Sequence, residues 1–282
     1  MAALNKGFRL VRRGEVTVLQ SPLLAQCPLT DHAFSTRLGG CSSGAMAALN
    51  TAFHTGDDRA LVLENRRRLL QPFGYEPDAV VAGIQVHGTG VARVTAADRG
   101  RGTVPGNFLG QYDALVTTEP GLVLTAYAAD CPILFLIEPQ RPLIALAHAG
   151  WRGTLGGMAH AVITCLQNNY GVDPARLLAA ISPCICPNCY HVGEDVAALF
   201  RRAGWGEAPY LEPEGPGKFR LDLSRINAAQ LREAGIEDDH LAENSWCTSC
   251  RPDLFYSYRR ENGVTGRMMA FLAIKPQRSR PL

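Results

Sequence analysis

Three short runs of the sequence place a soft metal ligand or nucleophile where an apolar stretch meets a chain-breaking residue. The apolar stretches 80–86, 122–129 and 143–147 are typical of buried strands. His87, Cys131 and His148 follow at or just beyond the ends of these expected strands. Two imidazoles and one thiolate suit a catalytic zinc site, in which three protein ligands leave a fourth position open. We therefore predict that these three residues share one metal site.

A lone His or Cys at a strand end is usually a packed, hydrogen-bonded side chain. Three of them in parallel settings favour a shared site, because Gly88 and Gly150 beside them permit close approach of the backbone. The intervals between the ligands, 44 residues and then 17, match no compact zinc-finger pattern. The prediction therefore depends on residue types and their strand-end setting rather than on spacing.

Two runs are specific enough to indicate a family, Ala-Asp-Cys-Pro at 129–132 and His-Ala-Gly-Trp-Arg-Gly at 148–153. Through them the sequence resembles the YfiH-like laccase-domain (polyphenol oxidase) family. Other matching runs lie at 35–40, 48–51, 64–66, 113–117, 222–223 and 255–260, so the resemblance covers nearly the whole chain. It implies purine nucleoside phosphorylase activity, with zinc held by His87, Cys131 and His148 in the pocket that binds the nucleoside. It also implies a single domain, here residues 1–282, of layered helices and mixed sheets.

Periodicity along the chain predicts four helices, at 57–70, 154–170, 195–203 and 224–234. Asp57 or Asp58 is expected near the start of the first helix, and Gly171 at the end of the second. The strands are joined by uneven connections rather than by strict strand-helix alternation. We therefore expect an α+β fold, a mixed α/β layered sandwich with mixed β-sheets flanked by helices, rather than a doubly wound sheet.

The expected reactions are phosphorolysis of adenosine, inosine and methylthioadenosine to the base and ribose 1-phosphate, together with deamination of adenosine. Phosphorolysis needs an anion clamp, for which Arg37 and Arg152 are candidates because guanidinium matches phosphate bidentately. Gln85, two residues before His87 and on the same strand face, and Asn50 are further candidates for substrate binding. Asp130, beside Cys131, is a candidate catalytic proton acceptor or partner of a ligand.

The histidine content decides whether this chain could bind the copper cluster of a true laccase. A multicopper oxidase needs many imidazoles, largely in His-x-His pairs, but this sequence has seven histidines and no such pair. It therefore cannot build that cluster by itself. A single copper ion could occupy the three zinc ligands in vitro, because copper competes well for nitrogen and sulfur donors.

Two other classes of function use the same residues. In a metal-free cysteine hydrolase, Cys131 would be the nucleophile and His148 or His87 its base. A reported link of YfiH-like proteins to cell-wall peptide editing belongs with this alternative. The other class is a non-enzymatic partner-binding protein, which a polar pocket surrounded by glycines does not favour.

The nine cysteines are expected to be reduced, because the sequence has no secretory signal. Five of them lie in two short segments, Cys184, Cys186 and Cys189 in one and Cys247 and Cys250 in the other. Pairs with CxxC spacing chelate zinc through a tight turn. The sequence leaves open whether these cysteines form a second metal site or are reduced thiols of surface loops.

Charge and hydropathy exclude several partners. The net charge of +2 is too small to indicate nucleic acid, and the basic clusters are short. The N-terminal segment lacks the apolar core of a signal peptide, and no stretch approaches the roughly 20 apolar residues that span a bilayer. We expect a cytoplasmic enzyme with purine nucleosides and phosphate as partners, and without nucleic acid, membrane or an obligate protein partner.

Overall fold

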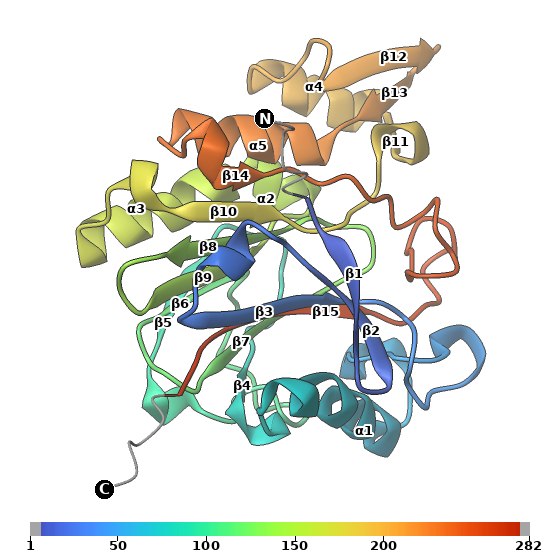
Figure 1. Ribbon diagram of the computed structural model, residues 1–282. Coiled ribbons are helices and arrows are strands. Elements are labelled where there is room, and N and C mark those ends of the chain that lie inside the picture. The colour runs from blue at the N-terminus through green and yellow to red at the C-terminus, as the bar shows by residue number, and fades with distance from the viewer. Residues whose placement is uncertain (1–6, 277–282) are drawn as a thin grey trace, which may run out of the picture.

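The computed structural model describes residues 7–276, which contain three β-sheets and five α-helices (Figure 1). The strands are β1 (Arg9–Arg13), β2 (Val16–Gln20), β3 (Thr30–Ser35), β4 (Val80–Val81), β5 (Val91–Val94), β6 (Ala114–Thr117), β7 (Val123–Ala128), β8 (Ile133–Glu138), β9 (Leu143–His148), β10 (Leu178–Ile181), β11 (His191–Gly193), β12 (Leu211–Gly215), β13 (Lys218–Leu221), β14 (Leu241–Ala242) and β15 (Met268–Ile274). The helices are α1 (Arg59–Leu70), α2 (Trp151–Leu155), α3 (Met158–Tyr170), α4 (Glu194–Arg202) and α5 (Leu223–Glu233).

Two six-stranded sheets form the body of the molecule. The first has the strand order β1-β2-β3-β15-β7-β4, and the second has the order β14-β10-β8-β9-β6-β5. Most neighbours are antiparallel, but β4 with β7, β5 with β6 and β10 with β14 are parallel. Both sheets are therefore mixed, which confirms the mixed α/β layered fold expected from the sequence.

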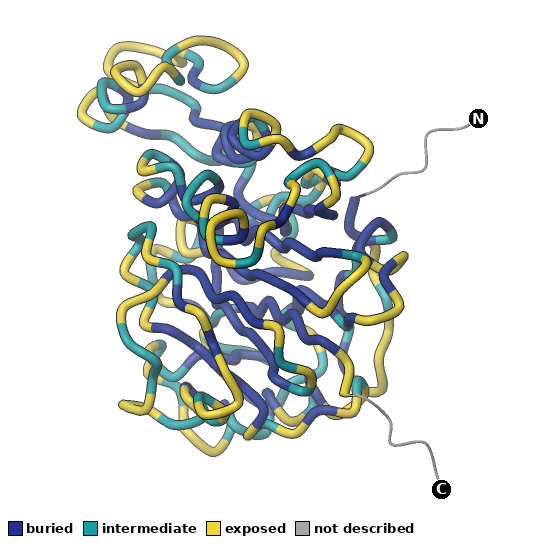
Figure 2. Tube along the Cα trace, turned by 90° about the vertical axis from the view of Figure 1, so that its left-hand side faces the viewer, coloured by how far each residue is buried: buried dark blue, intermediate teal, exposed yellow. Residues whose placement is uncertain are grey.

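The two sheets pack face to face and are covered by helices on their outer sides (Figure 1). In β7, alternate residues such as Leu124 and Ala126 point into the core between the sheets, where they join Phe135 of β8. Val123 and Tyr127 point to the opposite face, which packs against α1. Because both faces of the central strands β7, β8 and β9 are covered, most of their residues are apolar, and Figure 2 shows buried strands within a shell of exposed loops.

The predicted helices are largely confirmed. Helix α1 begins after Asp58, whose side chain accepts hydrogen bonds from the backbone of Ala60 and Leu61. Helices α4 and α5 also lie where the periodicity placed them. The continuous helix expected over 154–170 is wrong, because α2 ends at Leu155 and α3 starts only at Met158. Gly157 between them has φ +79°, a left-handed conformation that an α-helix cannot contain.

The strand expected over 80–86 is also mostly wrong. Only Val80–Val81 pairs within the first sheet, and the chain then turns away to bond with loops, Ala82 N to Arg101 O and Ile84 N to Gly110 O. A Cβ at Gly83 would lie 2.4 Å from the carbonyl oxygen of Tyr112, so this close passage needs glycine. Gln85 and His87 therefore do not share the face of a strand.

A small third sheet, in the order β11-β13-β12, packs with α4 around its own apolar cluster (Figure 1). Trp151 and Leu155 of α2 join this cluster, so the small sheet borders the segment that follows His148. Within residues 7–276, no helix combines the length and the apolar character needed to cross a membrane.

Candidate metal centre and active site

The structure brings His87, Cys131 and His148 together at one edge of the sheet sandwich. His148 is the last residue of β9, and Cys131 lies just before β8, which pairs with β9 so that Ile133 faces His148. His87 comes from the turn that follows the departure of the chain from β4. One possible ligand atom of each residue lies within 4.8 Å of the others. The rings of His87 and His148 meet edge to face, with their centroids 4.8 Å apart.

Asp113, directly before β6, holds both histidines in place. Its Oδ1 lies 2.8 Å from Nδ1 of His148 and accepts the backbone N–H of His87 at 3.0 Å. Its Oδ2 accepts the backbone N–H groups of Val86 and Gly88, at 3.1 and 2.8 Å. One buried carboxylate thus fixes the turn that carries His87 and leaves Nε2 of His148 as the nitrogen available to a metal. Carboxylates commonly orient metal-binding histidines in this way.

The backbone at this site is unusual in two respects. His87 and Asp130 have φ values of +60° and +100°, in the region that side chains other than glycine rarely adopt. Gly150 lies so close to the ligands that a Cβ there would meet Nδ1 of His87 at 2.4 Å and Sγ of Cys131 at 3.2 Å. The three ligands can therefore converge only because position 150 has no side chain.

The charges of Cys131 and His148 depend on each other. Burial alone would raise the pKa of the Cys131 thiol, but the positive charge of the neighbouring His148 lowers that pKa to about 6. Burial alone would lower the pKa of His148, yet the Cys131 thiolate and the hydrogen bond to Asp113 raise it to about 9. A thiolate paired with an imidazolium is the favoured state of the metal-free site at neutral pH.

The donor set fits a zinc ion. Nδ1 of His87 is buried and has no hydrogen-bond partner among the described residues, which is costly unless another group binds it. The Cys131 thiol ionises readily, and thiolate and imidazole are the donors that zinc prefers. Within the described chain the group holds three such residues, so a bound zinc would keep one position for substrate.

The three residues lie in the wall of a cavity of about 620 Å³. Large aromatic side chains form much of the remaining lining, and they are Phe53, Phe108, Tyr127, Trp151, Tyr190 and Tyr258. Four arginines also line it, and they are Arg66, Arg152, Arg259 and Arg267. Between residues 7 and 276, none of these four guanidinium groups forms a salt bridge. The cavity therefore combines flat apolar surfaces with unneutralised positive charge, which suits an anionic ligand that has an aromatic part.

Each of the four arginines is held by aromatic faces or by backbone carbonyls. Arg152 lies over the ring of Trp151, with 4.3 Å from Cζ to the ring centroid, and Arg259 lies over Tyr190 at 4.8 Å. Arg66 lies over Phe53 at 4.3 Å and donates to the carbonyls of Thr51 and Gly102. Burial lowers the pKa of Arg66 and of Arg267, since both charged groups have lost water. A bound anion would compensate for that loss.

Some of the residues predicted from the sequence line the cavity. Gln85, Asp130 and Arg152 do, but the amide of Gln85 is bonded on both sides to the backbone of Tyr127, at 2.9 and 2.8 Å. The Asp130 carboxylate accepts hydrogen bonds from Thr248 Oγ1, Ser257 Oγ and Arg259 N, at 2.7, 3.0 and 2.7 Å. These two side chains hold the cavity wall in place through bonds to other parts of the protein.

Two other candidates lie outside the cavity lining. Arg37 stacks on Tyr256, forms a salt bridge of 3.2 Å with Glu261 and donates to the carbonyl oxygen of Ala47. Asn50 is fully buried, and Oδ1 of its side chain accepts the backbone N–H of Arg267 at 2.9 Å. Arg37 is thus occupied by a carboxylate rather than free to clamp phosphate, and Asn50 positions the backbone of Arg267.

The sequence reasoning missed Asp113 and three of the four arginines, Arg66, Arg259 and Arg267. Arg66 and Arg259 each stand beside other arginines in the sequence, a pattern that is typical of exposed faces. The sequence did carry a signal for Arg66. Val62 and Leu69 lie on the same face of α1 and are apolar, which indicates that this face is buried. Asp113 gave no local signal, because its partners lie 25 to 35 residues away along the chain.

Similarity to known proteins identifies the family of the chain. Residues 31–275 match the family described as multi-copper polyphenol oxidoreductase laccase. The chain belongs to this family. A protein from Deinococcus radiodurans named purine nucleoside phosphorylase is 43% identical to it over 257 residues and aligns with 91% of this chain and 92% of its own.

Two further relatives of this laccase family are informative. Purine nucleoside phosphorylase YlmD from Geobacillus stearothermophilus is 40% identical over 245 residues, 84% of this chain and 88% of its own. Its crystal structure superposes with a TM-score of 0.88 at 36% identity and covers 95% of this chain and 99% of that one. Adenosine deaminase RL5, from an unknown prokaryotic organism, is 33% identical over 245 residues, 83% of this chain and 90% of its own. The family assignment thus supports an enzyme of the purine nucleoside phosphorylase type.

Proposed function

We propose that this protein is a zinc-dependent purine nucleoside phosphorylase that also deaminates adenosine. Its substrates would be adenosine, inosine and methylthioadenosine, and phosphorolysis would give the free base and ribose 1-phosphate. The observation that carries the proposal is the convergence of His87, Cys131 and His148 on a cavity lined by aromatic rings and by arginines without salt bridges. The names of the relatives support the same two activities.

The ligand residues would hold the metal in a fixed orientation. Zinc on three protein ligands would supply a Lewis acid with one open coordination position. Asp113 keeps the proton of His148 on Nδ1, so that Nε2 faces the metal. Gly150 leaves the ligands room to converge.

The arginines would bind phosphate beside the ribose. Monohydrogen phosphate attacks C1′ of the nucleoside as the bond from C1′ to the purine nitrogen breaks. The base leaves with the electron pair of that bond and takes up the proton that the phosphate brought. Arg152 is the foremost candidate for the clamp, because it lies four residues after His148 and its guanidinium makes no hydrogen bond or salt bridge among the described residues.

The aromatic residues would bind the purine. Rings such as Tyr127 and Tyr258 offer faces on which a purine can stack, and a neutral imidazole stands nearby at His54. Burial, followed by the positive charges of Arg267 and Arg66, lowers the pKa of His54, so this ring can hydrogen-bond without adding charge. In deamination the same orientation would present C6 of adenosine to water, with inosine and ammonia as products.

Product analysis tests the proposal directly. Purified protein is incubated with adenosine, inosine or methylthioadenosine, with and without phosphate, and the products are separated by chromatography. Ribose 1-phosphate should appear only when phosphate is present, whereas inosine should form from adenosine without phosphate. Release of base at the same rate without phosphate would instead indicate a nucleoside hydrolase.

A metal-free cysteine hydrolase remains a second candidate, favoured by one observation. The Cys131 thiol, His148 and Asp113 form a chain in which the imidazole lowers the thiol pKa to about 6 and the carboxylate orients the imidazole. Such an enzyme would cleave peptides, including those of cell walls, and would keep its activity after strong chelation. Loss of activity on chelation and its recovery with zinc would exclude it.

The remaining expectations belong to the same proposal. A cytoplasmic nucleoside-salvage enzyme would act on small molecules and need no nucleic acid, membrane or obligate protein partner. Copper could replace zinc on the same three ligands in vitro and cause weak oxidation of phenols. We therefore do not propose a true multicopper laccase, since the chain has seven histidines and no His-x-His pair.

A further inference from the structure

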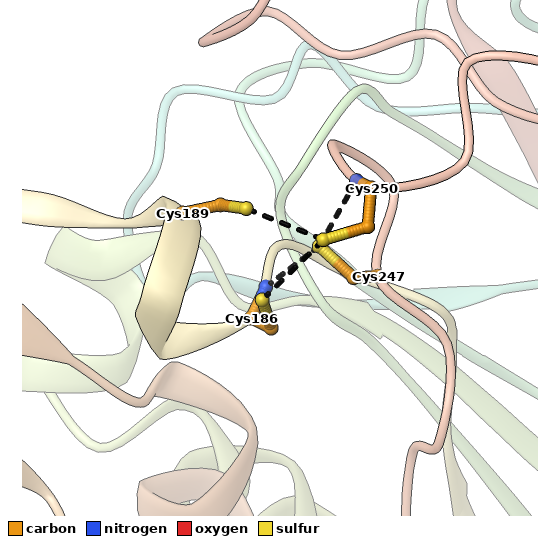
Figure 3. Close-up of side chains that lie close together, drawn as sticks. All are labelled: Cys186, Cys189, Cys247 and Cys250. Carbon is orange, nitrogen blue, oxygen red and sulfur yellow. Dashed lines mark hydrogen bonds between the residues drawn. The ribbon is translucent and has the colours of Figure 1, made fainter.

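Four cysteines from two distant segments meet at the surface beside the second sheet. Cys186 and Cys189 lie at the start and end of a short turn after β10, and Cys247 and Cys250 lie in the loop after β14. Figure 3 shows the four side chains converging, and one sulfur atom from each lies within 4.8 Å of the others. The Sγ atom of Cys250 is 3.4 Å from that of Cys189 and 4.0 Å from that of Cys186. We call this group the four-cysteine cluster.

We propose that the four-cysteine cluster is a second, structural zinc site. Four thiolates around zinc at about 2.3 Å form a tetrahedron whose sulfurs are about 3.8 Å apart, which is the scale of the distances seen here. Both pairs have CxxC spacing, so each pair can hold the metal from one turn. The cluster has a full set of four ligands and would leave no position for a substrate.

The backbone around the cluster is arranged as in a metal-binding turn. The N–H groups of Cys186 and Cys250 both point to Sγ of Cys247, at 3.3 and 3.4 Å (Figure 3). Such bonds favour the thiolate form that a metal needs. Four thiols would lose four protons as one zinc ion enters, leaving a site of charge −2 that these N–H groups help to stabilise. No disulfide joins any of the four within the described chain.

The two segments are already bonded to each other next to the cluster. Cys184 N donates to Trp246 O at 3.4 Å, and Thr248 N donates to Cys184 O at 3.1 Å. Cys184 itself is fully buried and lies outside the four-cysteine cluster. This pairing fixes the register of the two segments, so their CxxC turns face each other before any metal binds.

The same two segments support the wall of the active-site cavity. Ile185 N donates to the carbonyl oxygen of Asp130 at 2.9 Å, and Thr248 Oγ1 donates to its carboxylate at 2.7 Å. Tyr190, directly after Cys189, lines the cavity and stacks with Arg259. A zinc ion in the four-cysteine cluster would therefore brace the loop that carries Cys131 from outside, without touching the substrate.

Counting metal ions in the folded protein tests the inference. Protein is produced in zinc-containing medium, purified with a reductant and measured by native mass spectrometry and elemental analysis. We expect two zinc ions per chain in the original protein and one in Cys131→Ser, which keeps the cluster intact. Cys165→Ser, which changes a half-buried thiol outside both groups, should keep two. The inference is wrong if Cys131→Ser carries no zinc.

A second measurement does not depend on the folding of a cluster variant. In Cys131→Ser loaded with cobalt instead of zinc, intense sulfur-to-cobalt charge-transfer bands and the visible bands of tetrahedral cobalt should appear. Chelation should abolish these bands and expose four additional thiols to alkylation. In the triple variant Cys131→Ser/Cys189→Ser/Cys250→Ser these bands should be lost. The double variant Cys189→Ser/Cys250→Ser, produced with zinc, should keep one zinc ion, at the three-ligand site of His87, Cys131 and His148. Cluster cysteines found as disulfides in protein purified with reductant, or octahedral cobalt, would overturn the proposal.

Discussion

The two groups of possible metal ligands differ in almost every respect. His148 lies at the end of β9, Cys131 just before β8 and His87 in a turn, and the three converge in the wall of a cavity. The four-cysteine cluster comes from two turns, lies at the surface and offers four thiols. The first group has the incomplete ligand set of a catalytic site, and the second has the complete set of a structural one. The number of ligands and their access to the cavity, rather than the residue types alone, separate the two roles.

The groups that hold the possible ligands in place also differ between the two sites. At the first site a buried carboxylate, Asp113, fixes His148 and the turn of His87. At the second, backbone N–H groups alone point to a sulfur. A catalytic metal needs ligands of defined tautomer and direction, whereas a structural metal needs only sulfur atoms that can close around it.

The largest effect is expected from Cys131→Ser. A hydroxyl replaces thiolate poorly, so this variant should lose the zinc of the three-ligand site and lower phosphorolysis and deamination together by at least about 100-fold. Activity assays and metal analysis measure both losses, with Cys165→Ser as the control. If zinc at this site is retained while activity disappears, Cys131 acts as a nucleophile and the contrast between the two groups fails.

Asp113→Asn should weaken the three-ligand site and spare the four-cysteine cluster. The amide would turn an NH2 group toward at least one of the N–H donors that now bond to the carboxylate. Loss of such a partner typically weakens metal affinity about 10- to 100-fold. Competition with a chelator measures the affinity, and Asp78→Asn, an exposed carboxylate, is the control. Unchanged zinc affinity would show that Asp113 does not position the histidines for metal.

Arg152→Ala should separate the two reactions. Loss of a hydrogen bond to a charged group costs about 1.5 to 3 kcal/mol, so phosphorolysis should fall roughly 10- to 150-fold, mainly through a higher KM for phosphate. Deamination, which uses no phosphate, should fall less, and zinc content should not change. Arg202→Ala, at the exposed end of α4, is the control. Equal losses of both activities would place the phosphate clamp elsewhere.

The smallest effect concerns pH and is measured on metal-free protein. Alkylation requires the thiolate, and His148 lowers the pKa of Cys131 to about 6, so labelling should be fast at pH 7 and fall only below pH 6. Burial instead raises the pKa of Cys165, which should therefore react slowly at pH 7. Peptide mapping after brief treatment with iodoacetamide distinguishes the two thiols. Equal labelling of Cys131 and Cys165 at pH 7 would mean that His148 does not hold the proton of the Cys131 thiol.

The sequence allowed the family, the mixed layered fold and the three ligands to be proposed, for identifiable reasons. Strands β7 and β9 are continuous apolar runs because both of their faces are covered, and α1 starts at a carboxylate cap. Patterns of this kind depend only on residues that are close together in the sequence, so they can be predicted from it. The four cysteines were visible as two CxxC pairs, but only the structure places the pairs against each other.

The features that could not be predicted depend on contacts between distant parts of the chain. Residues 82–86 were expected to continue the strand from Val81, and Gly83 is the one residue of that run which indicates that the chain leaves the sheet there. Asp113 bonds to residues 25 to 35 positions away, and Arg37 is withdrawn from the cavity by Glu261, more than 200 positions away. Pairings of this kind leave no periodic signal.

The left-handed backbone at His87 and Asp130 destabilises the fold, although the side chains of both residues are needed at the site. L-residues other than glycine pay roughly 1 to 2 kcal/mol in this region, so glycine at either position would relax the chain. It would also remove a metal ligand at 87, or the carboxylate that gathers Thr248, Ser257 and Arg259 at 130. A laboratory population selected only for heat resistance should therefore accumulate glycine at position 87 and lose its activity, but keep Asp130, because its three hydrogen bonds outweigh the strain of its backbone.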